Sequence, residues 1–346
     1  MRATMKRRHI VRSFLALYAL IAAAIGIVWI WPAWRQHSVI REIDESGGSV
    51  LTEPGGPRWL RHWIGDERMK WFDRAVAVRF DTAGPLNLSS LTALPDVRML
   101  SFDESWVDDN DLQHLRGMER LEALSLDDTD ITDAGLAHLS GLTGLKTLKL
   151  NGTEITDVGL AHLRGLSKLT DLFVMGTKIT DAGLDNLQAL SSLDVLGLSS
   201  TRITSSGLRR LGTMPELHGL ILFDTAVDDT CIEYLQTLPC LEVLILDKTR
   251  ITDEGLRRLA SIDGLQKLSL SMTSITDRGL ESLQALTDLR RLNLTGTRVS
   301  DAGLEFLTGL GKLRRLEIDH TNVTSAGRKK LRAALPKVSL ERRDHE

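Results

Sequence analysis

The sequence is poor in cysteine and in aromatic residues. Only Cys231 and Cys240 occur among 346 residues. Two cysteines cannot build a disulfide framework, nor a cysteine-based zinc site with its four clustered ligands. Aromatic residues make up only 5%, whereas hydrophobic residues reach 42% and charged residues 26%. These fractions exclude a disordered or collagen-like chain and describe a folded protein in which leucine supplies most of the apolar side chains.

The chain also lacks a general excess of positive charge. Its formal net charge is −3. Residues 1–12 carry five bases and no acid, so the rest of the chain holds 38 bases against 46 acids. A protein that neutralises several phosphates needs a clustered excess of lysine and arginine on one face. The sequence therefore excludes a general nucleic-acid-binding protein.

Motifs that carry catalysis are absent as well. The sequence contains no G-x-S-x-G, no G-x-x-x-x-G-K-[ST], no H-E-x-x-H and no C-x-x-C. These motifs would supply a nucleophile, a phosphate loop, a zinc site or a redox pair. We therefore predict a non-enzymatic protein that uses no cofactor and no metal.

One long apolar run is present near the N-terminus. Phe14–Trp31 holds eighteen residues without a charge, which as a helix extend about 27 Å. Because five bases precede it, it predicts a single-pass membrane protein with a cytoplasmic N-terminus and an extracytoplasmic C-terminal part. A cleaved signal peptide with Ala22–Ala24 before the cut is the alternative. The small residues Ala22 and Gly26 would allow two such helices to form a homodimer.

A 24-residue period dominates the rest of the sequence. Each unit approximates L-x-x-L-x-L-x-x-T-x-I-T-D-x-G-L-x-x-L-x-x-L-x-x, and ten units without an insertion cover residues 97–336. L-x-x-L-x-L has the spacing of a short strand, and the leucines after the glycine have that of a short helix. A single unit cannot bury its leucines, so the units must stack into a curved solenoid with one parallel sheet. The units start at Val97, Leu121, Leu145, Leu169, Leu193, Leu217, Leu241, Leu265, Leu289 and Leu313.

Two polar positions of the unit have structural explanations. Position nine is Ser105 in the first unit and threonine in the other nine. A hydroxyl there would bond the backbone where the chain leaves the strand. The T-D step that follows, as in Thr156-Asp157, predicts a helix N-cap and an acid in the first helical turn.

The repeat unit resembles the leucine-rich-repeat superfamily, and is most similar to the 24-residue bacterial repeats of the GALA-like and F-box-associated type. Together with the apolar N-terminal run, the chain also resembles signal-anchored bacterial repeat proteins. This resemblance implies an α/β fold, a right-handed horseshoe solenoid with a concave parallel β-sheet and convex helices, here preceded by one transmembrane helix. It further implies recognition of a partner, usually a protein, by the strand face.

The repeats and the N-terminal run divide the chain into segments. We expect Trp59, Trp63 and Phe72 to cap the first repeat, with contact between this region and a bilayer surface as the alternative. Short strands are predicted at Val76–Phe80 and Lys337–Leu340. The predicted segments are a basic cytoplasmic tail (1–12), a transmembrane anchor (13–34), a membrane-proximal linker and N-terminal cap (35–74), a degenerate first repeat (75–96), the ten repeats (97–336), and a C-terminal strand and tail (337–346).

Alternation along the strand predicts that positions three, five, seven and eight of each unit lie on the exposed sheet face. In the middle units these positions become apolar, and an exposed apolar patch usually marks a contact surface. We therefore predict that the partner contacts Phe173, Met175, Val195, Ile221, Phe223, Val243 and Ile245.

Charge is distributed unevenly along the repeats. Residues 97–144 hold eleven acids and three bases, whereas residues 289–336 hold four acids and ten bases. Such polarity could orient a partner. Calcium accepts carboxylate ligands, but no D-x-D-x-D-G loop is present, so a solvated acidic face is expected. The acidic cluster consists of Asp103, Glu104, Asp127, Asp128 and Asp130.

The sequence thus favours a membrane-anchored binding protein whose strand face holds a protein or a cell-envelope component. Two alternatives stay open. One is a structural or self-associating envelope protein. The other is a cytosolic adaptor similar to the F-box-like ubiquitin-ligase proteins, although no F-box helix region is visible.

Overall fold

The computed structural model describes residues 20, 28, 30–80 and 88–340. Its strands form one 13-stranded sheet in chain order. The first pair of strands is antiparallel and every later pair is parallel. The strands are β1 (Ser49–Glu53), β2 (Arg74–Arg79), β3 (Met99–Ser101), β4 (Ala123–Ser125), β5 (Thr147–Lys149), β6 (Asp171–Phe173), β7 (Val195–Gly197), β8 (Gly219–Ile221), β9 (Val243–Ile245), β10 (Lys267–Ser269), β11 (Arg291–Asn293), β12 (Arg315–Glu317) and β13 (Ser339–Leu340).

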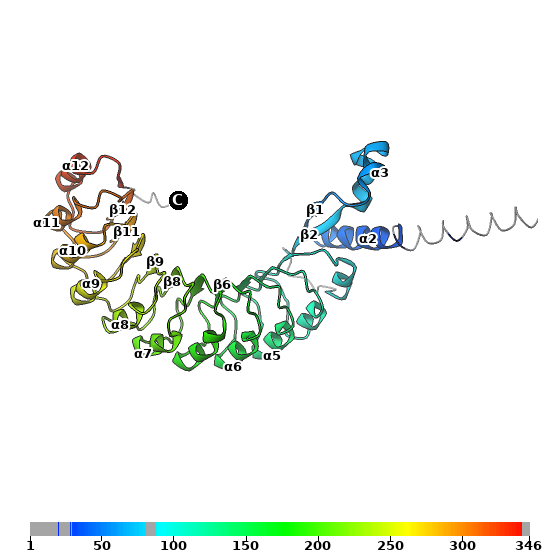
Figure 1. The fold of residues 1–346 in the computed structure, drawn as a ribbon, viewed down its shortest axis with the longest axis horizontal. Helices are drawn as coiled ribbons and strands as arrows, with labels where there is room; N and C mark the ends of the chain where they lie inside the picture. The colour runs from blue at the N-terminus through cyan, green and yellow to red at the C-terminus, as the bar shows by residue number, and fades with distance from the viewer. Residues whose placement is uncertain (1–19, 21–27, 29, 81–87, 341–346) are drawn as a thin grey trace, which may run out of the picture.

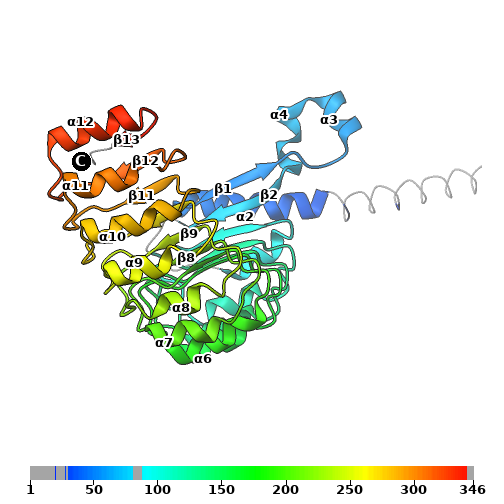
Figure 2. The same ribbon diagram turned by 60° about the vertical axis from the view of Figure 1, so that its left-hand side comes forward.

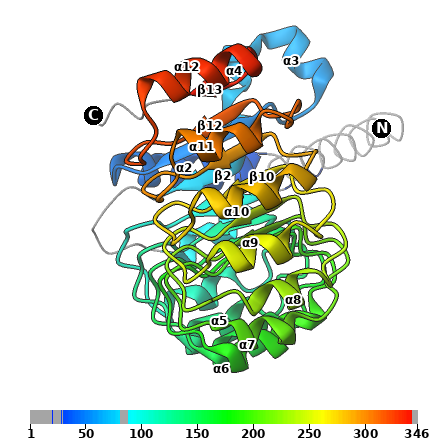
Figure 3. The same cartoon turned by 90° about the vertical axis from the view of Figure 1, so that its left-hand side faces the viewer.

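Short helices cover the outer side of the arc, and the strands line its inner side (Figure 1). Turned views show the later helices stacked one above another along the arc (Figures 2 and 3). With η for a 3₁₀ helix, the repeat helices are η4 (Asp111–Leu115), α5 (Asp133–Leu136), η5 (Ala137–Leu139), α6 (Asp157–Leu160), η6 (Ala161–Leu163), η7 (Asp181–Ala189), α7 (Ser205–Leu208), η8 (Arg209–Leu211), α8 (Cys231–Leu235), α9 (Asp253–Leu259), α10 (Asp277–Ser282), η9 (Leu283–Ala285), α11 (Asp301–Leu304), η10 (Glu305–Leu307) and α12 (Ser325–Ala334).

The leucine positions of the repeat form one continuous core. In the second unit, Leu121, Leu124, Leu126, Ile131 and Leu136 are all at most 1% exposed. Burying one such side chain stabilises the fold by about 1.5 to 3 kcal/mol relative to exposing it. The prediction of a stacked solenoid with a parallel sheet is confirmed.

The hydroxyl at position nine closes the turn after each strand. Thr129 Oγ1 donates to the backbone carbonyl of Leu126, three residues earlier, at 2.7 Å. The same bond recurs in all ten units at 2.5 to 2.8 Å. The predicted structural role of this column is therefore confirmed.

The T-D-x-G segment links most repeats to the next. Asp133 Oδ1 accepts the backbone N–H of Thr156 at 2.8 Å, and its Oδ2 accepts the Thr156 hydroxyl at 2.6 Å. Thr156 Oγ1 in turn accepts the N–H of Val158, which confirms the predicted N-cap. A Cβ on Gly159 would overlap the carboxylate of Asp133. The glycine is thus required because the aspartate of the preceding repeat occupies the space of a side chain.

One junction reverses these roles. Position thirteen of the preceding unit is Ser205, and its hydroxyl donates to Asp228 Oδ1 at 2.8 Å. Asp228 stands where seven of the other nine units have threonine, and it accepts the N–H of Thr230 at 3.0 Å. Hydrogen bonds from the hydroxyls of Thr230 and Ser205 lower the pKa of Asp228. Because serine is shorter than aspartate, position fifteen holds the buried Cys231 instead of glycine.

The N-terminal end of the solenoid is capped by α2 (Trp31–Glu45) and β1. Val39 and Ile43 of α2 are buried in the core, and β1 pairs with β2. The predicted cap by Trp59, Trp63 and Phe72 is wrong for the two tryptophans, because these side chains are 68% and 84% exposed. They lie on α3 (Arg58–Ile64), which with α4 (Asp66–Met69) and η2 (Lys70–Phe72) forms the connection between β1 and β2. The last element before the repeats is η3 (Leu88–Ala93).

The predicted localisation needs correction. In the part of the chain that the structure describes, no helix combines the length and the apolar character that a bilayer crossing requires. This finding contradicts the prediction of a single-pass membrane protein. Most of the apolar run, including Ala22 and Gly26, lies outside the described residues. Trp31, the last residue of the run, lies with Pro32 in the first turn of α2.

Candidate binding surface

Positions three, five and seven of each unit line the concave face, because side chains alternate along a strand. Neighbouring strands pair equivalent positions of successive units, so each position forms a column across the sheet. Position eight, predicted on this face, instead turns the chain away from the strand. It has a positive φ in all ten units, for example 58° at Glu104, 55° at Asp128 and 53° at Lys248. The turn requires this left-handed backbone in every unit, although it favours glycine and the column also holds long side chains such as those of Glu104 and Lys248.

The predicted contact residues lie together on β6–β9 and in the turns that follow; we call this set the apolar patch. Its members are all partly exposed: Phe173, Met175, Val195, Ile221, Phe223, Val243 and Ile245. The register aligns Phe173 with Gly197, Gly197 with Ile221, and Ile221 with Ile245. Strands about 4.8 Å apart therefore place these side chains in one contiguous surface.

Glycine shapes the surface of the patch. A Cβ on Gly197 would lie 2.8 Å from Phe173 Cδ1 and 3.4 Å from Met175 Cγ. Phe173 and Met175 thus lean across β7 into the space that a larger residue would fill. Gly219 has a similar relation to Val195, whose Cγ2 would lie 3.3 Å from an added Cβ. Phe173, Met175 and Val195 consequently extend over the neighbouring strand.

Polar groups border the apolar patch. The Lys248 ammonium lies 4.9 Å from the ring centroid of Phe223, a cation–π contact. Ser199, at position seven between Met175 and Phe223, is 5% exposed. Its hydroxyl has no hydrogen-bond partner among the described residues. A buried hydroxyl without a partner costs free energy.

The carboxylates of the acidic cluster extend the hydrogen bonding of the sheet. Asp103 Oδ1 accepts the N–H of Asp127 at 3.2 Å, and Asp127 Oδ1 accepts the N–H of Asn151 at 2.8 Å. Asn151 makes the equivalent bond one repeat later, where its neutral amide oxygen Oδ1 accepts the N–H of Met175 at 2.9 Å. Burial raises the pKa of Asp127, and the negative charge of Asp103 adds to this, although the bonds from Asn151 oppose it. Two acids of the cluster therefore serve the fold.

The other three acids point to no shared ligand. Glu104 and Asp128 are exposed turn residues at position eight, and Asp130 is exposed at position ten. Within the ranges 30–80 and 88–340, the structure contains no group of three or more histidine, cysteine or acidic side chains arranged to hold a metal ion.

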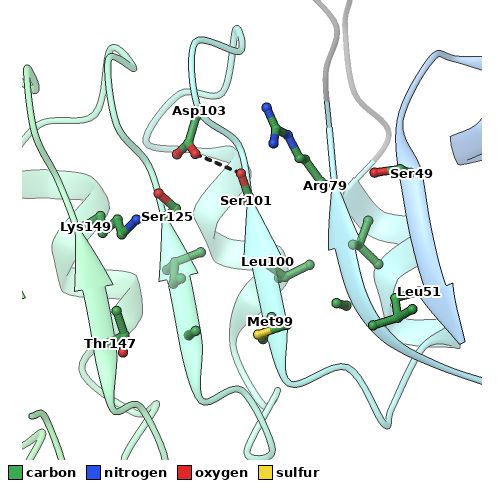
Figure 4. Close-up of a pocket in the computed structure, with 14 residues that line it drawn as sticks. Ser49, Leu51, Arg79, Met99, Leu100, Ser101, Asp103, Ser125, Thr147 and Lys149 are labelled. Carbon is green, nitrogen blue, oxygen red and sulfur yellow. Dashed lines mark hydrogen bonds between the residues drawn. The ribbon is translucent and has the colours of Figure 1, made fainter. Parts of the chain in front are cut away.

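A cavity of about 400 Å³ opens at the N-terminal end of the concave face, across β1–β5. Leu51 and Met99 lie at one end of it, and Asp103 and Arg79 point toward the other (Figure 4). Asp103 accepts a hydrogen bond from Ser101 at 3.0 Å. The sequence did not predict this cavity, because β1 comes from outside the repeats and its pairing with β2 has no periodic signal.

A second cavity, of about 380 Å³, lies at the C-terminal end of the face. Lys267, Arg291 and Arg315 line it, and all three occupy position three on β10–β12. We call them the basic row. Ile245 of the apolar patch lines the same cavity. The net charge of residues 289–336 was a sequence signal for this end, but it did not single out these residues.

Comparisons with known proteins agree with this architecture. Residues 78–330 match the family described as "Leucine-rich repeat region". No curated protein matches the sequence. Among solved structures, an internalin (inlF) from Listeria monocytogenes is similar at 21% identity and a TM-score of 0.55. The alignment covers 75% of this chain and 78% of the internalin.

A second similar structure is the leucine-rich-repeat ectodomain of the Arabidopsis receptor kinase HAESA, solved in complex with an N-terminally extended IDA peptide hormone ligand. It is 19% identical with a TM-score of 0.52, and the alignment covers 72% of this chain and 43% of the ectodomain. At these identities, both structures establish a shared fold.

Proposed function

Because this chain belongs to the leucine-rich-repeat family, we propose that it is a non-enzymatic binding module whose concave strand face holds a protein partner. The observation that carries the proposal is the apolar patch, a contiguous set of partly exposed large side chains on an inner sheet face. Contiguous exposed apolar surface on a soluble domain usually serves binding.

The distribution of the large exposed side chains favours the concave face over the convex one. On the outer helices, Val158 is an isolated large apolar side chain, because the equivalent positions of the two adjacent repeats hold only Ala134 and Ala182. On the inner face, two phenylalanines and a methionine lie within one cluster, and aromatic residues and methionine are enriched at interface centres. The receptor-kinase ectodomain of similar fold was solved with a bound peptide, which supports a polypeptide as the class of partner.

Site-specific photocrosslinking tests the proposal. A benzophenone side chain placed at Phe223 should capture a partner that mass spectrometry identifies, and the same group at Val158 on α6 should not. Val158 is a suitable control because it is 64% exposed and lies on the opposite face. Crosslinks from residue 223 only to a second copy of the chain would instead support self-association.

A further inference from the structure

The basic row places three charges of the same sign one repeat apart, whereas several other charged pairs at this spacing have opposite signs. Lys146 Nζ lies 2.8 Å from Glu122, and the same 24-residue spacing joins Glu154 to Lys178 and Asp288 to Lys312. In the basic row, by contrast, three cations follow one another in register on β10–β12. Like charges directly opposite each other on a sheet are destabilising.

Nearby acids do not neutralise the whole row. Glu317 accepts a hydrogen bond from Arg315 Nε at 2.9 Å. Asp247 also lines the cavity, where it accepts the hydroxyl of Ser269 and the N–H of Ser271, both at 2.5 Å, so two carboxylates face three cations. Within the described ranges, neither Lys267 nor Arg291 forms an ion pair.

Lys267 and Arg291 differ from the two acids Asp103 and Asp127, which lie one repeat apart at the N-terminal end of the solenoid. Asp103 and Asp127 are held by backbone N–H groups of the next strand. A lysine or arginine side chain has no acceptor and cannot bond the strand N–H groups in this way. The positive charge of Lys267 and Arg291 therefore stays available inside the cavity that they share with Ile245.

We propose that the basic row binds the carboxylate of an aspartate or glutamate in the same peptide segment whose apolar side chains contact the apolar patch. This inference rests on the proposed function and specifies the chemistry of the ligand. An acid placed between Lys267 and Arg291 makes charge-assisted hydrogen bonds and relieves the repulsion within the row. The partner is thus an extended, partly acidic segment.

The strand spacing sets the separation that the ligand must have. The midpoint of β10 and β11 lies about one and a half strands from β9, or about 7 Å. It lies about four and a half strands, or about 22 Å, from Phe173 on β6. An extended peptide rises about 3.3 Å per residue. The acid therefore lies about two residues from the side chain over Ile245 and about seven from the one over Phe173.

Selection from a phage-displayed library of random 16-residue peptides tests this proposal. The library is panned separately on the intact protein, on the variant Lys267→Gln/Arg291→Gln, and on the control Arg278→Gln/Lys329→Gln. The control makes the same change of charge at exposed positions of the outer helices α10 and α12.

Peptides selected by the intact protein and by the control should carry an acid at a fixed offset from apolar residues. The Lys267→Gln/Arg291→Gln variant should select the apolar residues without the acid. For one synthetic peptide, replacing its acid by the amide should weaken binding to the intact protein about tenfold or more. The same replacement should have little effect on the variant. Equal enrichment of acids on all three proteins, or equal weakening by the amide, would overturn the proposal.

The proposed function is tested separately in the same experiment. Each selected peptide is also bound to a variant with Phe173, Ile221 and Phe223 changed to serine. If the acid is enriched but the serine variant binds as well as the intact protein, the peptide does not use the apolar patch and both proposals fail. If the serine variant loses binding and no acid is enriched, the proposed function stands and the ligand chemistry is wrong.

Discussion

The reversed junction between the fifth and sixth repeats offers a sharp test of how the repeats are joined. In the other junctions an aspartate at position thirteen reaches a glycine in the next repeat, and a Cβ there would overlap its carboxylate. Here the equivalent positions hold Ser205 and Cys231, and Cys231 is fully buried. Changing Ser205 to aspartate should therefore force a carboxylate against the cysteine side chain and place it beside Asp228.

The size of the effect follows from the two contacts that change. Overpacking a buried site costs about 1 to 3 kcal/mol. The lost hydrogen bond from Ser205 to Asp228 contributes about 1 kcal/mol more. Ser205→Asp should therefore lower the free energy of unfolding by about 3 kcal/mol, which corresponds to roughly 5 °C in Tm for a domain of this size.

A compensated variant distinguishes this mechanism from general damage. Adding Asp228→Thr and Cys231→Gly to Ser205→Asp recreates the arrangement of Thr252, Asp229 and Gly255 one repeat later. The triple variant should regain stability to within about 1 kcal/mol of the natural protein, a coupling expected for residues in direct contact. Thermal and urea unfolding followed by circular dichroism measure both changes. The reasoning is refuted if Ser205→Asp is neutral, or if the triple variant is no more stable than the single one.

Three further predictions concern individual polar groups. Ser199→Ala should leave stability unchanged or raise it by about 1 kcal/mol, whereas Thr177→Val should lower it by about 1 kcal/mol, because only Thr177 makes a hydrogen bond; equal effects in urea unfolding would contradict this. Asp127→Asn should make the protein more stable at pH 7 than at pH 3, relative to the natural protein. Because the pKa of Asp127 is raised in the folded state, its contribution to the stability of the fold is lost as pH rises from the unfolded-state pKa of 3.8 through the folded-state pKa. Unfolding midpoints at both pH values check the sign. Burial raises the pKa of Cys231, so Ellman's reagent should titrate Cys240 in the native state and both thiols only after unfolding; rapid reaction of two thiols would disprove the burial.

The repeat is predictable from sequence because each position of the unit occurs ten times. The leucines, the hydroxyl of Thr129 and its equivalents, and the N-cap of Thr156 recur at a fixed spacing with one physical role. The link from Asp133 to Thr156 was not predicted, because it joins residues of different repeats. Only the stacked structure shows that Gly159 is required by the aspartate of the preceding unit.

Features outside the repeat were harder to predict because they occur once. Trp59 and Trp63 were assigned to the cap on their apolar character alone, but α2 and β1 already cover that end of the core. Hydrophobicity alone does not determine which of two neighbouring segments packs against the end of the core.

The sequence predicted only part of the candidate site, because some of its features depend on which residues of different repeats lie side by side. Strand alternation was sufficient to bring Phe173 and Ile221 onto one face, since it depends only on period two. The acidic cluster was grouped by charge, yet Asp103 and Asp127 bond the backbone of the next strand, which depends on register. The cations at Lys267 and Arg291 share one column, but counting net charge over two repeats does not reveal a column.

The affinity of the identified partner for a patch variant tests the central claim most directly. The change of Phe173, Ile221 and Phe223 to serine should weaken binding in isothermal titration at least a hundredfold, since buried aromatic anchors at an interface centre contribute about 2 kcal/mol or more each. The control Trp106→Ser/Val158→Ser removes two side chains that are 71% and 64% exposed off the patch, and should bind like the natural protein. An affinity within twofold of the natural value for the patch variant, with its fold intact, would contradict binding through the concave face.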